Sequence, residues 1–435
     1  MMDALVETEI GRLPAIWKVQ PLSELFETQL GKMLSQKARV GNAPKPYLRN
    51  KNVQWGRIDV SDILHMDFDQ REIEKFRLRP GDLLVCEGGE PGRAAIWNGA
   101  LTECFYQKAL HRLRPRDGRM LNDFMNYWLR FSFDLQNLYG AAGASSTIAH
   151  LPEVQLKSLP IPVPPLPEQR KIAGVLGVVQ RAMEQQELLL ALTAELKKTL
   201  LHQLFTHGLR GEPQKQTEIG PVPESWKVVP LGDYLAAAQY GISAKGAEAG
   251  RYALLRMTNQ LQGRISSDNL QYVDLTQGQF EKFRVEQQDI LFNRTNSLEL
   301  VGRTAIFDIE GDFVFASYLI RLRTDAERLR PHFLNLYFNW DETQARLKSI
   351  ATRAVSQSNI SATRLRGFPV LVPSPEEQDE IVANLDAVDR KIDIHRRKHG
   401  SLTALFRTLL HQLMTAQIRV HDFELPALSD HIDEQ

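Results

Sequence analysis

The feature that most constrains the fold of this chain is a repeat of its own architecture at an interval of 209 residues. Three segments of the first half return in the second half at this interval, with changed contents between them. At 435 residues the chain is long enough for two or three domains. Each half therefore contains a start motif, a globular stretch, a proline segment and a long helix. The matching pairs are Ile10–Trp17 and Ile219–Trp226, Leu159–Ile172 and Phe368–Ile381, and Leu200–Leu204 and Leu409–Leu413.

The two globular stretches have the pattern of mixed, β-rich domains. Short apolar runs, such as Gly81–Cys86 and Asp289–Phe292, are separated by turn residues, as strands are. Each stretch also contains an aromatic-rich segment that predicts a helix, around Leu121–Tyr139 and around Pro331–Ile350.

Each globular stretch is followed by prolines and then by an amphipathic segment. Prolines are excluded from helix interiors and favour an extended path, so the helices are predicted to begin near Glu168 and Glu377. Gly208 is the predicted stop of the first helix. At 1.5 Å per residue each helix would be roughly 55–60 Å long, which predicts that the two pack on each other in antiparallel fashion. The apolar residues assigned to this helix pair are Ile172, Leu176, Val179, Met183, Leu200, Leu204, Ile381, Leu385, Val388, Ile392, Leu409 and Leu413.

The predicted fold class is α+β. Two mixed, β-rich domains are joined and separated by two long α-helices that form an antiparallel coiled coil, with a pseudo-twofold internal repeat. The alternative for one such helix alone is an ordinary buried helix, but two matched helices favour a spacer. The predicted segments are residues 1–160 (first domain), 161–208 (first proline segment and helix), 209–368 (second domain), 369–416 (second proline segment and helix) and 417–435 (acidic tail).

The composition and the known sequence motifs exclude several classes of function. No apolar run reaches membrane-spanning length and the acidic N-terminus has no signal core, so we expect a cytoplasmic protein with no membrane partner. Cys86 and Cys104 are the only cysteines, which favours reduced thiols, and Cys86 is predicted to be a small buried one. The sequence contains no P-loop, no Gly-x-Gly-x-x-Gly after a strand and no Asp/Asn-Pro-Pro-aromatic motif.

Two pairs of residues could be mistaken for a metal site and a catalytic site. His395 and His399 lie four residues apart on the second long helix and could share a metal, but no third ligand completes the set. Glu87 and Glu90 could be taken for paired catalytic carboxylates. Their counterparts in Asn293–Glu299 are mostly uncharged, which favours a loop that changes with its target. We therefore predict neither a catalytic residue nor a metal site.

Basic residues are concentrated locally although the net charge is zero. The segment from Gln36 to Arg57 contains six cations and no acid. Such a run can be a solvated face, but within a repeated frame it favours a nucleic-acid partner.

These features together resemble the specificity subunit of a type I restriction–modification system, over nearly the whole chain. The most specific parts are the proline segments with their helix starts, the strand start at Asp289–Phe292, and Asn293–Ser297 leading to Gly302–Arg303. The first half departs from this last pattern at Glu87–Glu90. The resemblance implies two target recognition domains, each of which reads one half of a split, asymmetric DNA site. The helices would set the unread spacer.

The resemblance also implies that the chemistry belongs to other chains. Two methyltransferase subunits would use S-adenosylmethionine to methylate adenine N6, after the base is flipped. Motor–nuclease subunits would use ATP and Mg²⁺ to translocate and cut DNA. This chain would be a non-catalytic subunit with no cofactor of its own and with double-stranded DNA as its ligand. The apolar helix surface outside the mutual seam would bind the methyltransferase subunits.

Contact chemistry selects the predicted DNA-binding residues. Arg can bind guanine bidentately, Asn can bind adenine, and Lys mostly binds phosphate. Arg49 and Arg57 recur as Arg256 and Arg264, which suits a role in the fold or a shared backbone contact better than base reading. The predicted residues are Lys45, Arg49, Lys51, Asn52, Arg57, Lys108, Ser145 and Ser146 in the first domain, and Arg256, Asn259, Arg264, Asn293, Arg294, Asn296, Gln357 and Ser358 in the second.

Two other functions stay open at this point. A related type II-like restriction–methylation system could use the same kind of subunit, and the neighbouring genes would separate it from type I. A coiled-coil scaffold that binds proteins would show no salt-dependent affinity for DNA.

Overall fold

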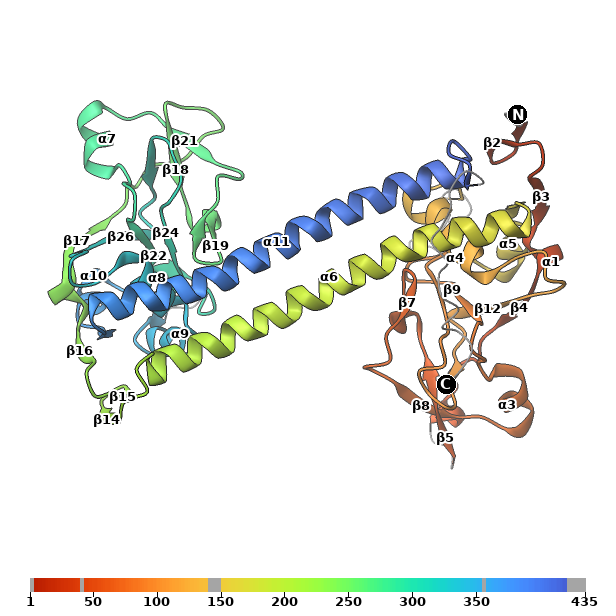
Figure 1. Ribbon diagram of the computed structural model, residues 1–435, viewed down its shortest axis with the longest axis horizontal. Helices are drawn as coiled ribbons and strands as arrows, with labels where there is room; N and C mark the ends of the chain where they lie inside the picture. Colours follow the sequence, from red (N-terminus) through yellow and green to blue (C-terminus); the bar gives the residue numbers. More distant parts are fainter. Residues whose placement is uncertain (1–3, 40–42, 140–149, 354–356, 421–435) are drawn as a thin grey trace. The chain divides into compact units, whose positions relative to one another are not determined.

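The computed structural model describes residues 4–39, 43–139, 150–353 and 357–420. The chain divides into two compact units. Unit 1 contains Met1–Glu187 and Arg397–Gln435, and unit 2 contains Leu188–Arg396. Each unit combines one globular domain with part of each long helix (Figure 1), so neither is simply one half of the sequence.

Unit 1 is a mixed α/β structure. Its strands are β1 (Leu5–Thr8), β2 (Gly11–Pro14), β3 (Lys18–Pro21), β4 (Phe26–Leu30), β5 (Pro44–Leu48), β6 (Val53–Gln54), β7 (Arg57–Ile58), β8 (Leu64–Asp67), β9 (Leu83–Cys86), β10 (Ala94–Ile96), β11 (Phe105–Tyr106), β12 (Leu110–Pro115) and β13 (Pro160–Val163). Its helices are α1 (Leu22–Leu25), α2 (Gln36–Arg39), α3 (Gln70–Phe76), α4 (Asn122–Arg130), α5 (Glu153–Ser158) and the first part of α6 (Leu166–His207). The main sheet has the order β10-β9-β12-β4, and a second sheet has the order β11-β5-β8. Every residue of β9 is buried, as its apolar run predicts.

Unit 2 repeats this plan. Its strands are β14 (Gln214–Thr217), β15 (Gly220–Pro223), β16 (Lys227–Pro230), β17 (Leu235–Tyr240), β18 (Tyr252–Leu255), β19 (Gln260–Leu261), β20 (Arg264–Ile265), β21 (Gln271–Val273), β22 (Ile290–Asn293), β23 (Thr295–Asn296), β24 (Thr304–Ile306), β25 (Phe313–Phe315), β26 (Leu319–Thr324), β27 (Thr352–Arg353), β28 (Ser358–Asn359) and β29 (Pro369–Val372). Its helices are α7 (Gln277–Phe283), α8 (Pro331–Asn339), α9 (Asp341–Ser349), α10 (Ala362–Arg366) and the first part of α11 (Pro375–Met414). The main sheet has the order β17-β26-β22-β24-β20-β19, and a second sheet has the order β21-β18-β25.

The aromatic-rich segments are helical, with one correction. In unit 1, α4 continues into a π-helical turn at Phe131–Leu135. The single helix predicted around Pro331–Ile350 was wrong, because Trp340 is extended, with ψ 135°, and separates α8 from α9. The buried Trp340 ring lies 5.5 Å from that of Phe205 in α6, so tertiary packing accompanies the break.

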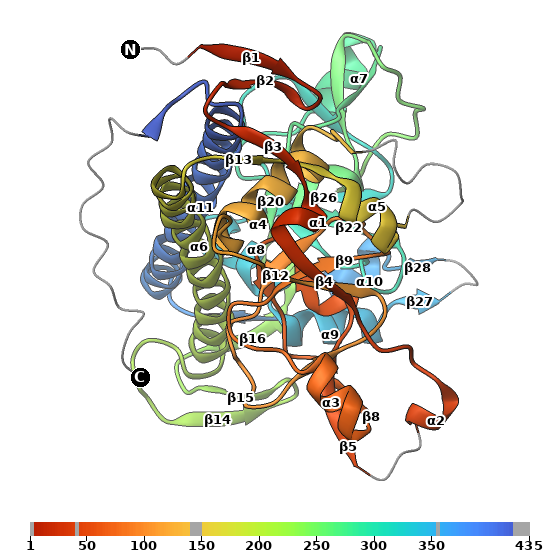
Figure 2. The same ribbon diagram turned by 90° about the vertical axis from the view of Figure 1, so that its right-hand side faces the viewer.

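The proline segments are extended, as predicted, and each is fixed to its domain. Strand β13 pairs with β3, and β29 pairs with β16; the first pair is visible in Figure 2. Trp17 Nε1 donates to the Glu168 carboxylate at 2.9 Å, and Trp226 Nε1 donates to Glu377 at 3.1 Å. All four residues are buried, so the start motif anchors the beginning of the long helix in each unit.

The ends of the long helices also bind to these glutamates. Gly208 follows α6 with a φ of +64°, the left-handed conformation that a glycine stop requires, and confirms the predicted end. The next N–H, that of Leu209, donates to Glu377 at 2.9 Å. In unit 1 the corresponding hydrogen bond comes from Arg419, which follows α11 and whose Nε donates to Glu168 at 2.8 Å.

In each unit, segments of α6 and α11 run in opposite directions and share a buried cluster. In unit 1, Glu168 near the start of α6 contacts the chain after α11, and Glu187 contacts His399 in the middle of α11. In unit 2, Lys197 bonds to Asp389 at 2.6 Å. The shared apolar residues are Ile172, Leu176, Val179, Met183, Phe406, Leu410, Leu413 and Met414 in unit 1, and Leu204, Phe205, Ile381 and Leu385 in unit 2.

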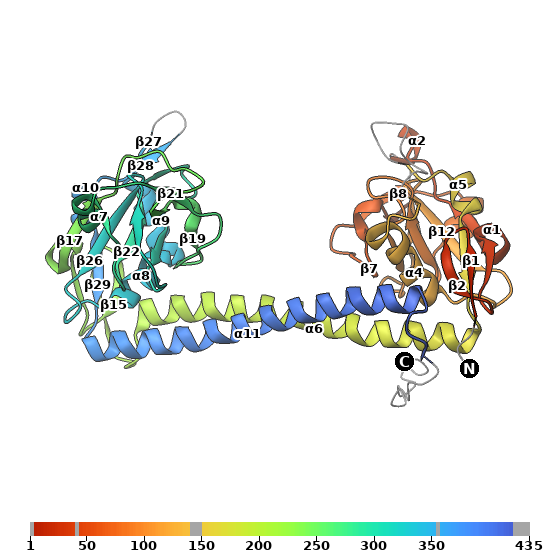
Figure 3. The same ribbon diagram turned by 90° about the horizontal axis from the view of Figure 1, so that it is seen from above.

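Other apolar residues of the long helices are less covered. Of the predicted helix-pair residues, Leu200, Val388, Ile392 and Leu409 are only half-buried. Leu188, Leu192 and Leu196, which we call the leucine stripe, are 59%, 57% and 54% exposed. Their spacing of four places them on one side of the unit 2 segment of α6. Figure 3 shows the globular domain of unit 2 lying along one side of its helix segments.

Within the described part of the chain, no helix is both long enough and apolar enough to cross a membrane.

Candidate nucleic-acid interface

The turn after β22 holds Arg294 by its backbone and its side chain. The Arg294 N–H donates to the Tyr318 carbonyl at 3.0 Å, and the Arg294 carbonyl accepts from Ile360 at 2.9 Å. The guanidinium lies over the Tyr240 ring, 4.8 Å from its centroid, and Nη1 donates to the Ser317 carbonyl at 3.3 Å. An arginine stacked in this way has a fixed plane, which favours bidentate hydrogen bonding.

The predicted polar segments of unit 2 come together beside this turn. Strand β23 pairs with β28, which sets Asn296 opposite Ser358. The exposed Gln357 precedes this pair, whereas Ser358 is buried. Asn296 donates its amide to Met257 Sδ at 2.9 Å, and Asn293 is only 2% exposed. Arg294, Asn296 and Gln357 are therefore the accessible members of the set that the structure brings together.

Sequence reasoning missed two exposed tyrosines next to Arg294. Tyr240 is 41% exposed and Tyr318 is 48% exposed. The Tyr240 hydroxyl accepts the N–H of Ala362 at 2.8 Å, so its ring is held in place. Rigid aromatic rings on a surface are common in binding sites. A tyrosine at the end of a strand gave no such signal in the sequence.

The recurrent asparagines Asn52 and Asn259 hold their own turns. Each is at most 2% exposed. Their side-chain oxygens accept the N–H groups of Arg49 and Arg256, at 2.9 and 3.0 Å. Their amide groups donate to carbonyls seven to ten residues later. Because these side-chain groups already have hydrogen-bond partners within their own turns, they favour a role in the fold over base reading.

Most of the cationic run in unit 1 has acidic partners from other segments. Arg49 and Lys51 both bond to Asp62 at 2.8 Å, and these hydrogen bonds, from Lys51 first, lower the pKa of the Asp62 carboxyl. Lys45 bonds to Glu103 at 2.6 Å. Exposed ion pairs are weak, so a phosphate can compete for the exposed Lys51.

Arg57 and Arg264 lie on the side of each domain that faces the helices of its own unit. Arg57 bonds to Glu187 of α6 at 3.3 Å. Arg264 is exposed and lines a cavity of about 770 Å³ in unit 2, together with Asp389 and Arg396 of α11. Their shared place next to the helices agrees with a role common to both halves.

The arginines of β12 and β26 belong to a shared framework. Arg114 binds both carboxylate oxygens of the buried Asp82, at 2.5 and 2.7 Å. Arg323 does the same with the buried Asp289, at 2.6 and 3.0 Å. These hydrogen bonds raise the pKa of each guanidinium. Charge in these strands therefore stabilises the fold and is not available to DNA.

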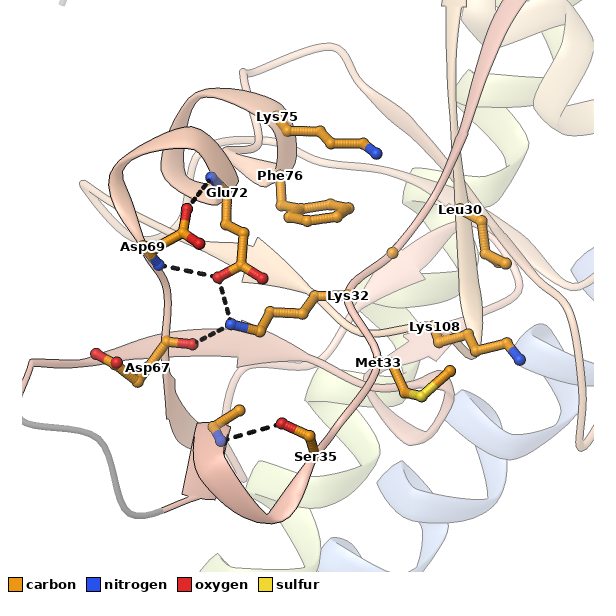
Figure 4. A pocket seen from close by; sticks show the side chains of 12 residues that line it. Leu30, Lys32, Met33, Ser35, Asp67, Asp69, Glu72, Lys75, Phe76 and Lys108 are labelled. Carbon is orange, nitrogen blue, oxygen red and sulfur yellow. Dashed lines mark hydrogen bonds and ion pairs between the residues drawn. The ribbon is translucent and has the colours of Figure 1, made fainter.

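Lys108 borders a cavity of about 560 Å³ in unit 1 (Figure 4). On one side of the cavity, Lys32 bonds to Glu72 at 2.5 Å and to the Asp67 carbonyl at 2.6 Å. Lys108 lies across the cavity from Glu72 and is exposed. It remains a predicted phosphate contact. Ser145 and Ser146 lie outside the described residues.

The two thiols are buried and not bonded to each other. Burial raises the pKa of Cys86 to about 11, so this thiol is protonated near neutral pH. Over the described parts of the chain, no group of three potential metal ligands occurs.

Comparison with known proteins identifies the repeated unit. The type I restriction modification DNA specificity domain matches twice, over residues 14–193 and 223–404. The chain therefore belongs to the family of type I restriction–modification specificity subunits.

Relatives match along almost the whole length. The EcoKI specificity subunit of Escherichia coli K12 is 20% identical over 94% of this chain and 90% of its own length. The StySPI specificity subunit of Salmonella potsdam is 22% identical over 95% and 93%. The crystal structure of the S subunit from M. genitalium covers 91% of this chain and 96% of its own, with a TM-score of 0.58 at 18% identity, and shows the same fold.

Proposed function

We propose that this chain is the non-catalytic subunit that selects the DNA site of a type I restriction–modification enzyme. Each domain reads one half of a bipartite, asymmetric sequence. The observation that carries this proposal is the pair of family domains with one framework and different exposed side chains. The buried Asp–Arg pairs of β12 and β26 recur, whereas Tyr240 and Tyr318 belong to unit 2 only.

The long helices set the distance between the half-sites. Two half-sites on one duplex must be separated by a fixed length, and a pair of packed helices provides one. The proposed antiparallel coiled coil is supported by the opposite direction of the segments and by the buried cluster within each unit. The Trp17–Glu168 and Trp226–Glu377 bonds support a fixed attachment of each domain.

The leucine stripe is the proposed binding surface for methyltransferase subunits. Three leucines more than half exposed on one helix face are a patch that a partner helix would cover. S-adenosylmethionine would bind to those subunits, and ATP and Mg²⁺ would bind to motor–nuclease subunits, while this chain contributes the DNA contacts.

Reconstitution tests this proposal. The purified chain should neither methylate nor cut DNA, and should direct sequence-specific adenine methylation once its methyltransferase partner is added. Methylation by the isolated chain would contradict the proposal. Absence of DNA binding at low salt, with the partner present, would favour the protein scaffold, because phosphate contacts are strongest there.

A further inference from the structure

The turn after β9 in unit 1 repeats the backbone hydrogen bonds of the turn that holds Arg294. The Glu87 N–H donates to the Ala109 carbonyl at 2.9 Å, and the Glu87 carbonyl accepts from Leu151 at 2.7 Å. Arg294 makes the same two bonds, to Tyr318 and to the residue that follows β28. Glu87 in unit 1 and Arg294 in unit 2 therefore occupy the same position, with opposite charges. Glu87 thus has a charged counterpart, Arg294, within the mostly uncharged segment Asn293–Glu299.

The neighbouring strand confirms this equivalence. The Gly31 N–H donates to the Leu110 carbonyl at 2.9 Å, and the Gly241 N–H donates to Leu319 at 3.2 Å. The residue before each glycine is therefore equivalent, so Leu30 stands where unit 2 has Tyr240. The frame is the same in both units, and the side chains around it differ.

Among the described residues, neither charge is neutralised by an opposite charge. Glu87 and Arg294 are both half-buried, and among the residues that the structure describes neither forms an ion pair. In contrast, Arg323 of the same domain is paired with Asp289. A partly desolvated charge without an opposite charge beside it is unfavourable, so these two positions favour an external ligand with complementary groups.

The opposite charges identify the kind of ligand. A phosphate would bind Arg294 but would be repelled by Glu87, so contact with the DNA backbone cannot be the function that the two positions share. Base edges can serve both: arginine binds O6 and N7 of guanine bidentately, and glutamate accepts from the N4 amino group of cytosine. The Tyr240 ring holds the guanidinium plane as bidentate contact requires.

We propose that Glu87 and Arg294 are equivalent specificity-determining residues, and that Arg294 reads a guanine in one half-site while Glu87 reads a cytosine in the other. This inference rests on the proposed function. Tyr240 acts as a positioning residue for Arg294.

Reciprocal charge reversal tests the proposal. Arg294→Glu and Glu87→Arg are expressed separately in cells that contain the partner subunits, and adenine methylation is mapped across the genome. Each variant should lose preference at one base pair of its own half-site, by about fivefold to a hundredfold, with the other half-site unchanged. The unchanged half-site is the internal control.

Arg294→Lys separates base reading from phosphate contact, because lysine keeps the charge but not the bidentate geometry. It should also relax that one position. An unchanged motif for Arg294→Lys, or a relaxed position in the wrong half-site, overturns the inference. Loss of all methylation by Arg294→Glu with a native melting temperature, together with an unchanged Arg294→Lys motif, also overturns it. If the wild-type chain directs no bipartite methylation, the proposed function itself fails, which is a distinguishable outcome.

Discussion

Replacement of all three leucines of the leucine stripe by alanine is predicted to weaken binding of the methyltransferase subunits about a hundredfold. Full burial of a leucine contributes about 1.5–3 kcal/mol, and the three leucines are 59%, 57% and 54% exposed. A partner that covers the exposed part would therefore lose about 1 kcal/mol per truncated side chain. The sum is about 3 kcal/mol, which corresponds to about a hundredfold in Kd.

The same substitutions should leave the fold intact, because alanine is a better helix former than leucine and the removed atoms are mostly exposed. The assay is a titration of the purified variant with methyltransferase subunits, beside a urea unfolding curve. Leu64, in β8 of unit 1, is 42% exposed and serves as the matched control for Leu192. An unchanged Kd for the triple variant would refute the assignment of this surface. So would an equal loss of affinity in the single variants Leu64→Ala and Leu192→Ala.

Three further predictions concern the framework. Asn52→Ala should lower the free energy of unfolding by about 1–3 kcal/mol in urea without changing the methylated sequence, because the buried amide holds its own turn; a changed motif would show that it reads bases. Burial lowers the pKa of His111 below its usual 6.5, so as pH falls the unfolded chain takes up this proton before the folded chain does, and stability should fall below pH 6.5. In His111→Gln the melting temperature should depend less on pH over this range. An unchanged dependence of the melting temperature on pH would contradict this. Gly241→Ala places a Cβ 2.3 Å from the Ala316 carbonyl oxygen and should destabilise the chain by more than about 2 kcal/mol, whereas Gly278→Ala in α7 meets open space and should be neutral or stabilising; equal melting temperatures for the two variants would contradict the close approach.

The sequence repeat predicted the proline segments and the ends of the long helices because the residues at these positions determine the local backbone conformation. Prolines fix extended segments, an acid follows them at a helix start, and a glycine ends the first helix; all three are visible in the chain itself. The break at Trp340 was not predictable, because no proline or glycine marks it. The Trp340 ring packs against Phe205. These two residues are far apart in the sequence, so residue patterns do not show this contact.

The candidate site was harder to predict for two physical reasons. No acidic residue lies within the run of six cations, but Arg49 and Lys45 form ion pairs with Asp62 and Glu103, which are 13 and 58 residues away in the sequence. The equivalence of Glu87 and Arg294 was hidden as well, since loop lengths differ between the copies and the interval there is not that of the proline segments. Backbone hydrogen bonds reveal it, and residue spacing does not.

We propose that two domains with one framework read two different half-sites at a fixed distance. Genome-wide mapping of adenine methylation, in cells with and without this gene and with its partner subunits present, tests it most directly. We expect a gene-dependent motif of two unlike halves separated by an unread spacer of constant length. A continuous motif, a palindromic one, or identical methylation in the two strains would contradict it.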